Sequence, residues 1–400
     1  MSVEYWIWLQ KVLGYCNEAV SRVISDYGTA ENFYHASDSE RIVRCRLNKF
    51  QAERLHKISR KEVFGVINLC AKCGINILTP EDTLYPERLL SIFDMPAVLY
   101  VKGDRFDFNN NPTVAIVGPR KVSDYGLNCA FVIANTLASC GFTVVSGCAV
   151  GGDSAVHRGA IEADGYTVGV LGCGIESDYL MVNAELRKAI TKKGCLVSEY
   201  PPDMGVTRGA FPKRNRIISG LSNAVVVIEG STESGTLITA RHAAEQGRDV
   251  YVIPGSPTLP QYEGSNRLIA DGARPLLNVN EIINEYLHLY PDKIHSPKNI
   301  VSVYRKDAYK SGQHEVKEKE AVTVPNNDDE RVTAKPDKGV LSGEAIEVLR
   351  VFEQLTESFN ADDAIDKLDF DAGTVLGAVT ELEICGFIEA VVGGKYRLKY

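Results

Sequence analysis

A cluster of cations lies between Phe211 and Gly220, where the chain reads FPKRNRIISG. Lys213, Arg214 and Arg216 surround a single Asn215, and their like charges repel one another unless an anion or solvent offsets them. Guanidinium groups suit phosphate oxygens because their fork of N–H donors binds two acceptors at once. Since apolar strand-like runs flank the stretch, we interpret it as a loop that leads into a short helix. By itself, the stretch is equally consistent with a solvated cationic turn.

Small and basic residues at the ends of other apolar runs complete a candidate phosphate site. Gly-rich turns before helices present free backbone N–H groups and the positive end of the helix dipole. Such a pocket binds phosphates without reading base edges, which suits sequence-tolerant binding of single strands. Phe211 or Tyr200 would stack a base or pack in the core. The predicted nucleic-acid-binding residues are Gly118, Arg120, Ser146, Gly147, Gly151, Lys213, Arg214, Asn215, Arg216, Ser234, Gly235 and Thr236.

A regular alternation of apolar runs and helix-length segments positions these residues. The runs are TVAIVG, FTVVSG, YTVGVLG, CLVSE, AVVVIEG and DVYVIPG, all between residues 113 and 255. They are rich in β-branched residues and nearly continuous in apolar character, as parallel strands buried on both faces are. Strands that alternate with helices predict an α/β fold, here a Rossmann-like parallel sheet. Ligands bind at the carboxyl ends of strands in such sheets, where these glycines lie.

Bulk composition limits the classes of function. The chain has 400 residues, a formal net charge of −8 and 44% hydrophobic residues, so a polyanion would have to bind in a local basic pocket. No apolar run is long enough to cross a membrane, and the N-terminus does not read as a signal peptide. Ten cysteines are scattered, and Cys70 and Cys73 form a CxxC without a second pair. We therefore predict a cytoplasmic protein with reduced thiols and no metal or cofactor.

Four segments are expected. Residues 1–80 read as a helical module that resembles small SAM-like or helix-hairpin-helix bundles, and residues 81–295 as the Rossmann-like core. Residues 296–339 are charged and aperiodic, which predicts a disordered linker. Residues 340–400 read as three helices and a hairpin, the pattern of a winged helix. Its presumed recognition helix carries Glu381 and Glu383 and no Lys or Arg, which favours protein contact over base reading.

The core resembles the DNA-processing protein A (DprA/Smf) family. The blocks that carry the resemblance, in order, are AIVGPR, SGCAVGGDSAVH, VLGCGIE, SEYPP, FPKRNRIISGLS, ESGTLITARHAAEQGRDVYVIPG and GSNRLIADGA. The resemblance implies a bacterial cytosolic protein that binds single-stranded DNA, dimerises through the core and loads a RecA-type recombinase during natural transformation. The family usually has Ser where this chain has Pro119, which removes a hydroxyl and a backbone N–H from the first loop.

Enzymatic alternatives are weaker. Asp153 and His157 have the spacing of an acid–base pair, but we interpret Asp153 as the cap of a helix that begins at Ser154, with His157 packed beside it. The block EGSTESGTLIT resembles the phosphate loop of lysine-decarboxylase-like phosphoribohydrolases, PGGxGTxxE, yet Thr239 stands where that loop has its catalytic glutamate. A dinucleotide oxidoreductase is disfavoured because GPRKVSDYG is not GxGxxG. A nucleotide-processing enzyme remains the alternative to a non-catalytic DNA-binding protein.

Overall fold

The structure is a computed structural model, and it describes residues 3–103, 108–178, 183–295, 341–354 and parts of 362–398. The chain divides into two compact units, residues 1–315 and 316–400. The predicted linker, residues 296–339, lies outside the described residues. The predicted boundary at residue 80 falls inside the first unit.

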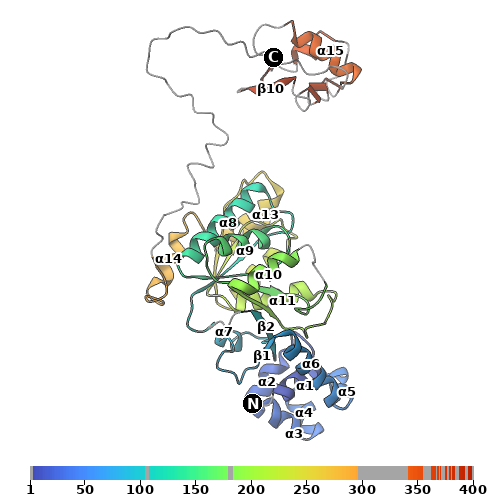
Figure 1. The fold of residues 1–400 in the computed structure, drawn as a ribbon, viewed down its shortest axis with the longest axis vertical. Coiled ribbons are helices and arrows are strands. Elements are labelled where there is room, and N and C mark those ends of the chain that lie inside the picture. The colour runs from blue at the N-terminus through green and yellow to red at the C-terminus, as the bar shows by residue number, and fades with distance from the viewer. Residues whose placement is uncertain are drawn as a thin grey trace. The chain divides into compact units, whose positions relative to one another are not determined.

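A nine-stranded sheet forms the centre of the first unit (Figure 1). Its strand order is β1-β2-β6-β5-β4-β3-β7-β8-β9. All six predicted core strands are present as β3 to β8, and they pair in parallel. β2 pairs antiparallel with β6 and with β1, so these two strands, which precede β3 in the chain, extend one edge of the parallel sheet. The strands are β1 Asn76–Leu78, β2 Leu99–Gly103, β3 Thr113–Val117, β4 Thr143–Ser146, β5 Thr167–Leu171, β6 Gly194–Ser198, β7 Ala224–Val227, β8 Asp249–Val252 and β9 Arg274–Pro275.

Helices cover both faces of this sheet, as the alternating pattern predicts. Alternate strand residues enter separate hydrophobic clusters, Ile116 on the face covered by α8, α9 and α14 and Val117 on the face covered by α10, α11 and α12. Every residue of β3 is buried, which explains its unbroken apolar sequence. The helices are α7 Glu87–Leu90, α8 Asp124–Ser139, α9 Gly152–Glu162, α10 Ala184–Lys193, α11 Ala210–Gly220, α12 Gly235–Glu245, α13 Glu263–Ala270 and α14 Asn280–Leu287.

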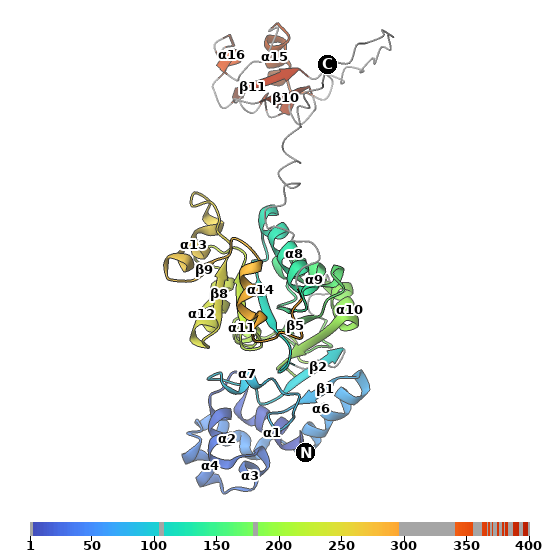
Figure 2. The same cartoon turned by 90° about the vertical axis from the view of Figure 1, so that its left-hand side faces the viewer.

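Six helices gather at the N-terminal end of this unit, beside β1 and β2 (Figure 2). They are α1 Val3–Leu13, α2 Ala19–Tyr27, α3 Ala30–His35, α4 Asp38–Arg44, α5 Lys49–Lys57 and α6 Arg60–Cys73. Capping boxes at Asn48 and Ser59 start α5 and α6, and Gly74, at φ 65°, ends α6. Trp6 and Leu9 belong to the same hydrophobic cluster as Ala115 of β3, so these helices share a core with the sheet.

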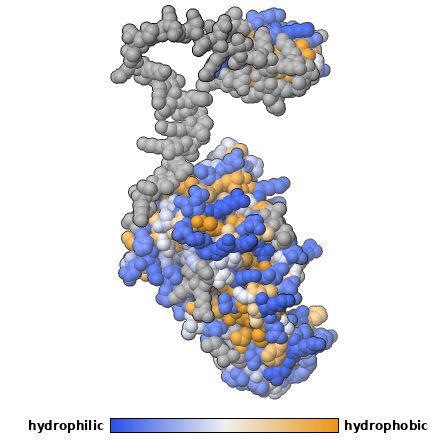
Figure 3. Space-filling model, viewed as in Figure 1, coloured by the Kyte–Doolittle hydropathy of each residue, from blue (hydrophilic) through white to orange (hydrophobic). Residues whose placement is uncertain are grey.

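Hydrophilic residues cover most of the face of this unit shown in Figure 3, and hydrophobic residues appear there in smaller patches. No helix in the described parts of the chain is long and apolar enough to cross a bilayer. The same residues contain no group of three or more His, Cys, Asp or Glu side chains placed to hold a metal ion.

The second unit contains α15 Gly343–Phe352, α16 Asp362–Ile365 and an antiparallel pair, β10 Ile388–Val391 and β11 Lys395–Leu398. Two predicted helices and the predicted hairpin are therefore present. Only part of the expected third helix, residues 372–385, is described, and those residues are helical. Glu381 accepts hydrogen bonds from the Ser342 amide and hydroxyl, both at 2.7 Å, beside the start of α15. Its carboxylate thus ties this helical segment to the start of α15.

Candidate nucleic-acid interface

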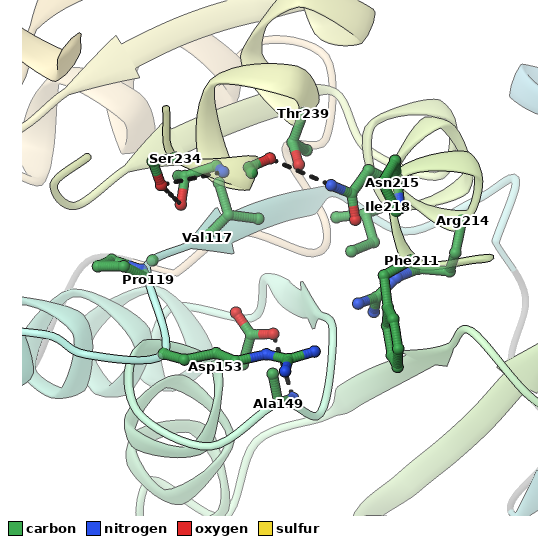
Figure 4. Close-up of a pocket in the computed structure, with 15 residues that line it drawn as sticks. Val117, Pro119, Ala149, Asp153, Phe211, Arg214, Asn215, Ile218, Ser234 and Thr239 are labelled. Carbon is green, nitrogen blue, oxygen red and sulfur yellow. Dashed lines mark hydrogen bonds between the residues drawn. The ribbon is translucent and has the colours of Figure 1, made fainter. Parts of the chain in front are cut away.

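A cavity of about 270 Å³ opens at the carboxyl end of β3 (Figure 4). The chain reverses its direction across the sheet at this place, because β4, β5 and β6 follow on one side of β3 and β7 and β8 on the other. Open α/β sheets bind ligands at such switch points. The lining residues are Val117, Gly118, Pro119, Arg120, Ala149, Asp153, Phe211, Pro212, Arg214, Asn215, Ile218, Ser234, Gly235, Thr236 and Thr239.

One wall of the cavity is the helix α11. Phe211, Arg214, Asn215 and Ile218 line the cavity at spacings of three and four residues, so they share one helix face. The expected loop before a short helix is wrong, because the whole stretch from Ala210 to Gly220 is helical. A helix fixes the directions of these side chains more firmly than a loop would.

Two of the predicted cations face this cavity in different environments. Arg120 is exposed and its guanidinium carbon lies 5.1 Å from the centre of the Phe211 ring, a cation–π contact. Arg214 is buried, and its Nη1 donates to the carbonyl oxygens of Gly147, at 2.8 Å, and of Val170. Burial lowers the pKa of Arg214, and the carboxylate of Asp153 opposes that effect. Arg214 is therefore a fixed cation, whereas Arg120 lies at the solvent-exposed rim.

The opposite wall is the first turn of α12. Ser234 caps this helix, and its hydroxyl accepts a hydrogen bond from the Thr236 amide at 3.3 Å. The side-chain amide of Asn215 donates to the Gly235 carbonyl at 3.2 Å, which ties α11 to α12 across the cavity. Backbone N–H groups in a first helical turn lack intrahelical partners and favour anions.

The next four predicted residues do not line the cavity. Lys213 is exposed on α11. Ser146 is fully buried and donates to the Ile116 carbonyl at 2.7 Å, so it joins β4 to β3. A Cβ on Gly147 would come within 2.6 Å of an Asp153 oxygen, and one on Gly151, at φ 85°, within 2.8 Å of the Pro119 carbonyl. Both glycines thus permit close packing beneath the cavity.

Arg216 is the predicted site residue that the structure places elsewhere. It is fully buried on the far side of α11, where its Nη2 lies 2.8 Å from a Glu199 oxygen and its Nε 3.0 Å from an Asp94 oxygen. The expectation that Arg216 is one of the nucleic-acid-binding residues of the pocket is therefore wrong. Glu199 and Asp94 are far from it in sequence, so the pattern KRNR gave no sign of this pairing.

Asp153 is a cavity residue that sequence analysis assigned to another role. The helix α9 begins at Gly152 with Gly151 as its cap, so the expected cap at Asp153 is wrong. Its carboxylate instead accepts a hydrogen bond from the Ala149 amide at 3.2 Å and lines the cavity (Figure 4). Burial raises the pKa of Asp153, and Arg214 counteracts the rise. The Pro119 carbonyl accepts from the Gly152 amide at 3.1 Å, so this loop contributes an acceptor that secures α9.

Comparisons with known proteins identify the family of this chain. The model of the DNA recombination-mediator protein A family matches residues 76–287. Protein Smf from Synechocystis is 35% identical over 287 residues, which are 70% of this chain and 71% of that protein. The chain belongs to the DNA recombination-mediator protein A family. DNA processing protein DprA from Bacillus subtilis, another relative, is 39% identical over 212 residues, or 53% of this chain and 71% of that protein.

The solved structures agree with this family assignment. The X-ray structure of DprA from Streptococcus pneumoniae superposes with a TM-score of 0.63 at 30% identity. The superposition covers 70% of this chain and 97% of that one. The match to the DNA recombination-mediator protein A model spans every strand from β1 to β9 and all the residues that line the cavity.

Proposed function

We propose that the protein binds single-stranded DNA in the cavity at the end of β3 and acts as a recombination mediator without catalysis. The observation that carries the proposal is the convergence of Arg120, Arg214 and the first turn of α12 on one cavity in a chain of net charge −8. These groups bind phosphate oxygens and do not read base edges. The ring of Phe211, already stacked under Arg120, offers a flat surface to a base.

Family membership supports single-stranded DNA and a RecA-type recombinase as the proposed partners. The name of the family describes a recombination mediator, and the Bacillus subtilis relative is named a DNA processing protein. On this basis the protein acts in the cytoplasm and loads a RecA-type recombinase onto single-stranded DNA during DNA uptake. In reactions with a single-strand-binding protein, adding this protein should shorten the lag before the recombinase forms filaments. An unchanged lag at saturating protein would exclude loading.

A homodimer through the core is part of the same proposal. Leu268 and Ile269 are half-buried on α13, and Leu277, just after the edge strand β9, is 51% exposed. A groove of about 710 Å³ between α12, α13 and β9 adjoins them. Apolar groups exposed beside a sheet edge suit a two-fold contact, the commonest kind among oligomers.

The flanking segments have auxiliary roles. We propose that the helices α1 to α6 form a SAM-like or helix-hairpin-helix module, and that the second unit is a winged helix that contacts protein. The helix–helix–hairpin order of α15, α16, β10 and β11 supports the winged helix.

The experiment that tests the function compares two activities of the purified full chain. Fluorescence anisotropy with labelled oligo-dT measures DNA binding, and release of ribose phosphate from AMP measures phosphoribohydrolase activity. We expect saturable oligo-dT binding that weakens as salt rises, and no turnover of AMP. Thr239, which lines the cavity where the hydrolase loop would carry its glutamate, provides no general acid or base. AMP hydrolysis without oligo-dT binding would replace this proposal with the enzymatic alternative.

A further inference from the structure

The helix α11 separates two sites of different chemistry. Its cavity face carries Phe211, Arg214, Asn215 and Ile218. The residues Arg216 and Gly220 belong to its other side, where a Cβ on Gly220 would come within 2.6 Å of Leu89. Movement of either side of a rigid helix displaces the other.

A buried ion cluster fixes the far side of α11. The guanidinium of Arg216 contacts both oxygens of Glu199, at 2.8 and 2.9 Å, and an oxygen of Asp94 at 3.0 Å. Burial alone would lower the pKa of Arg216, but the two carboxylates outweigh it and raise that pKa. Separating Arg216 from its carboxylates would leave a buried cation uncompensated, so the cluster resists rearrangement.

Residues on and just after α1 hydrogen-bond to Glu199 and Asp94, the two acidic residues of this cluster. On α1, Gln10 donates from Nε2 to the Glu199 carbonyl oxygen at 2.9 Å. Just after α1, the Cys16 amide donates to Glu199 Oε1 at 3.4 Å, and the Cys16 thiol donates to Asp94 at 2.8 Å. The ring of Tyr15 also packs on that of Tyr200, with centroids 4.7 Å apart. The position of α1 therefore influences the positions of Glu199 and Asp94, which bind Arg216 of α11.

We propose that α11 couples the docking of the N-terminal helices to occupation of the DNA cavity, with Arg216 as the positioning residue. This inference rests on the proposed binding of single-stranded DNA. DNA on the cavity face shifts α11, and the shift reaches α1 through Arg216, Glu199 and Asp94. By reciprocity, loosening the cluster from the side of α1 weakens DNA binding, although none of these groups touches the cavity.

The tryptophans provide a direct readout of this coupling. The chain contains two, Trp6 and Trp8, and both are buried on α1, away from the cavity. Tryptophan emission therefore reports on the N-terminal helices, while anisotropy of labelled oligo-dT reports on the cavity. In the full-length protein, we expect emission to change along the same titration curve as anisotropy.

Asp94→Asn is the test variant, and Asp26→Asn, an exposed carboxylate on α2, is the matched control. We expect Asp94→Asn to bind oligo-dT roughly fivefold more weakly with an unchanged salt dependence, because no phosphate contact is lost. Its tryptophan response should shrink, and Asp26→Asn should match the wild type. Cys16→Ala removes a neutral contact to the same carboxylate and should show a smaller change in the same direction, which keeps the test usable if Asp94→Asn does not fold.

The outcomes separate the coupling from the proposed function. Oligo-dT binding without any change in tryptophan emission would overturn the coupling alone. So would wild-type affinity and emission in a folded Asp94→Asn or, if that variant does not fold, in Cys16→Ala. An absence of oligo-dT binding by anisotropy would overturn the proposed function, and the coupling with it.

Discussion

Arg214 and Arg216 are separated by one residue on α11, yet their guanidinium groups occupy two different sites. Arg214 reaches the Gly147 carbonyl and lines the cavity, whereas Arg216 binds Glu199 on the far side of the helix. Residues two apart on a helix point in widely different directions, so a run of neighbouring cations need not serve one ligand. Asn215, between them, bonds to Gly235 and keeps the cavity face of α11 against α12.

Replacing both Arg120 and Lys213 by Ala should weaken oligo-dT binding and flatten its salt dependence. Each lost phosphate contact should reduce the slope of log K against log salt by about 0.7 for a single strand. Lys49 and Lys61 are exposed on the N-terminal helices, so Lys49→Ala with Lys61→Ala is a control of equal charge. Anisotropy titrations at several salt concentrations measure the slope, and equal slopes in both double variants would exclude the assigned phosphate contacts.

Gly151→Ala should cost stability and DNA affinity together. The new Cβ would need a left-handed backbone at φ 85° and would crowd the carbonyl groups of Arg120 and Pro119. The Pro119 carbonyl is the acceptor that holds α9. Gly247 has φ 68°, and a Cβ added there would meet nothing within 4 Å, so Gly247→Ala measures a left-handed backbone cost without crowding, roughly 1–2 kcal/mol. Urea unfolding and oligo-dT titration should show larger losses of stability and of DNA affinity for Gly151→Ala than for Gly247→Ala. Equal losses in the two variants would contradict the crowding.

His157 should make the protein sensitive to mild acid. Its Nδ1 bonds to the Thr167 hydroxyl at 2.8 Å, and that hydroxyl donates to the Val144 carbonyl, so Nδ1 carries the proton. The other ring nitrogen lies 3.5 Å from the Cys148 sulfur, and the ring is fully buried. Burial, with a contribution from Arg214, lowers the pKa of His157 from 6.5 to about 3.

The sign of the effect follows from this lowered pKa. Below pH 6.5 the unfolded chain takes up a proton at His157 that the folded protein excludes until about pH 3. This residue therefore stabilises the fold fully above pH 6.5, and its contribution falls by up to about 1.4 kcal/mol per pH unit toward pH 3. Urea unfolding at several pH values measures how the free energy of unfolding changes with pH. Below pH 6.5, this free energy should fall less steeply for His157→Gln than for the wild type. Identical slopes would mean that the ring accepts a proton in the folded state.

Truncation after Gly339 should change the dissociation constant for oligo-dT by less than about threefold. The carboxylate of Glu381 is engaged with Ser342 at the start of α15, which lowers the pKa of Glu381. Glu381 therefore stabilises the start of α15 within the second unit. This structural role explains the residue without any contact to DNA. A loss of tenfold or more in an anisotropy titration would show that the second unit holds DNA.

Leu277→Arg should convert the proposed dimer to monomers, because a charge would replace an exposed apolar side chain beside β9. Light scattering on the full chain at micromolar concentration measures the mass. Val43→Arg, at a 74% exposed position on α4, is the matched control and should leave the mass unchanged. A monomeric wild type would exclude the dimer.

The sheet was predictable from sequence because strands buried on both faces must be apolar throughout, as β3 and β7 are. The cavity was predictable in outline because small residues mark the carboxyl ends of these strands. The sequence did not predict that Arg214 and Arg216 of KRNR occupy different sites. That difference depends on Glu199 and Asp94, which contact Arg216 only in the folded chain. Asp153 was assigned to capping because an Asp near a helix start usually has that role.

The central place of β3 in the sheet has a consequence for synthesis of the chain. Its partner on one side is β7, and the bond from the Thr113 amide to Asn223 joins residues 110 apart. At about 5–20 residues per second, a ribosome needs roughly 5–20 s to add that length, and one edge of β3 stays unpaired throughout. Ribosome-bound chains that end before Ala224 should therefore be cut by protease within the first sheet strands, and chains extended past Val252 should resist.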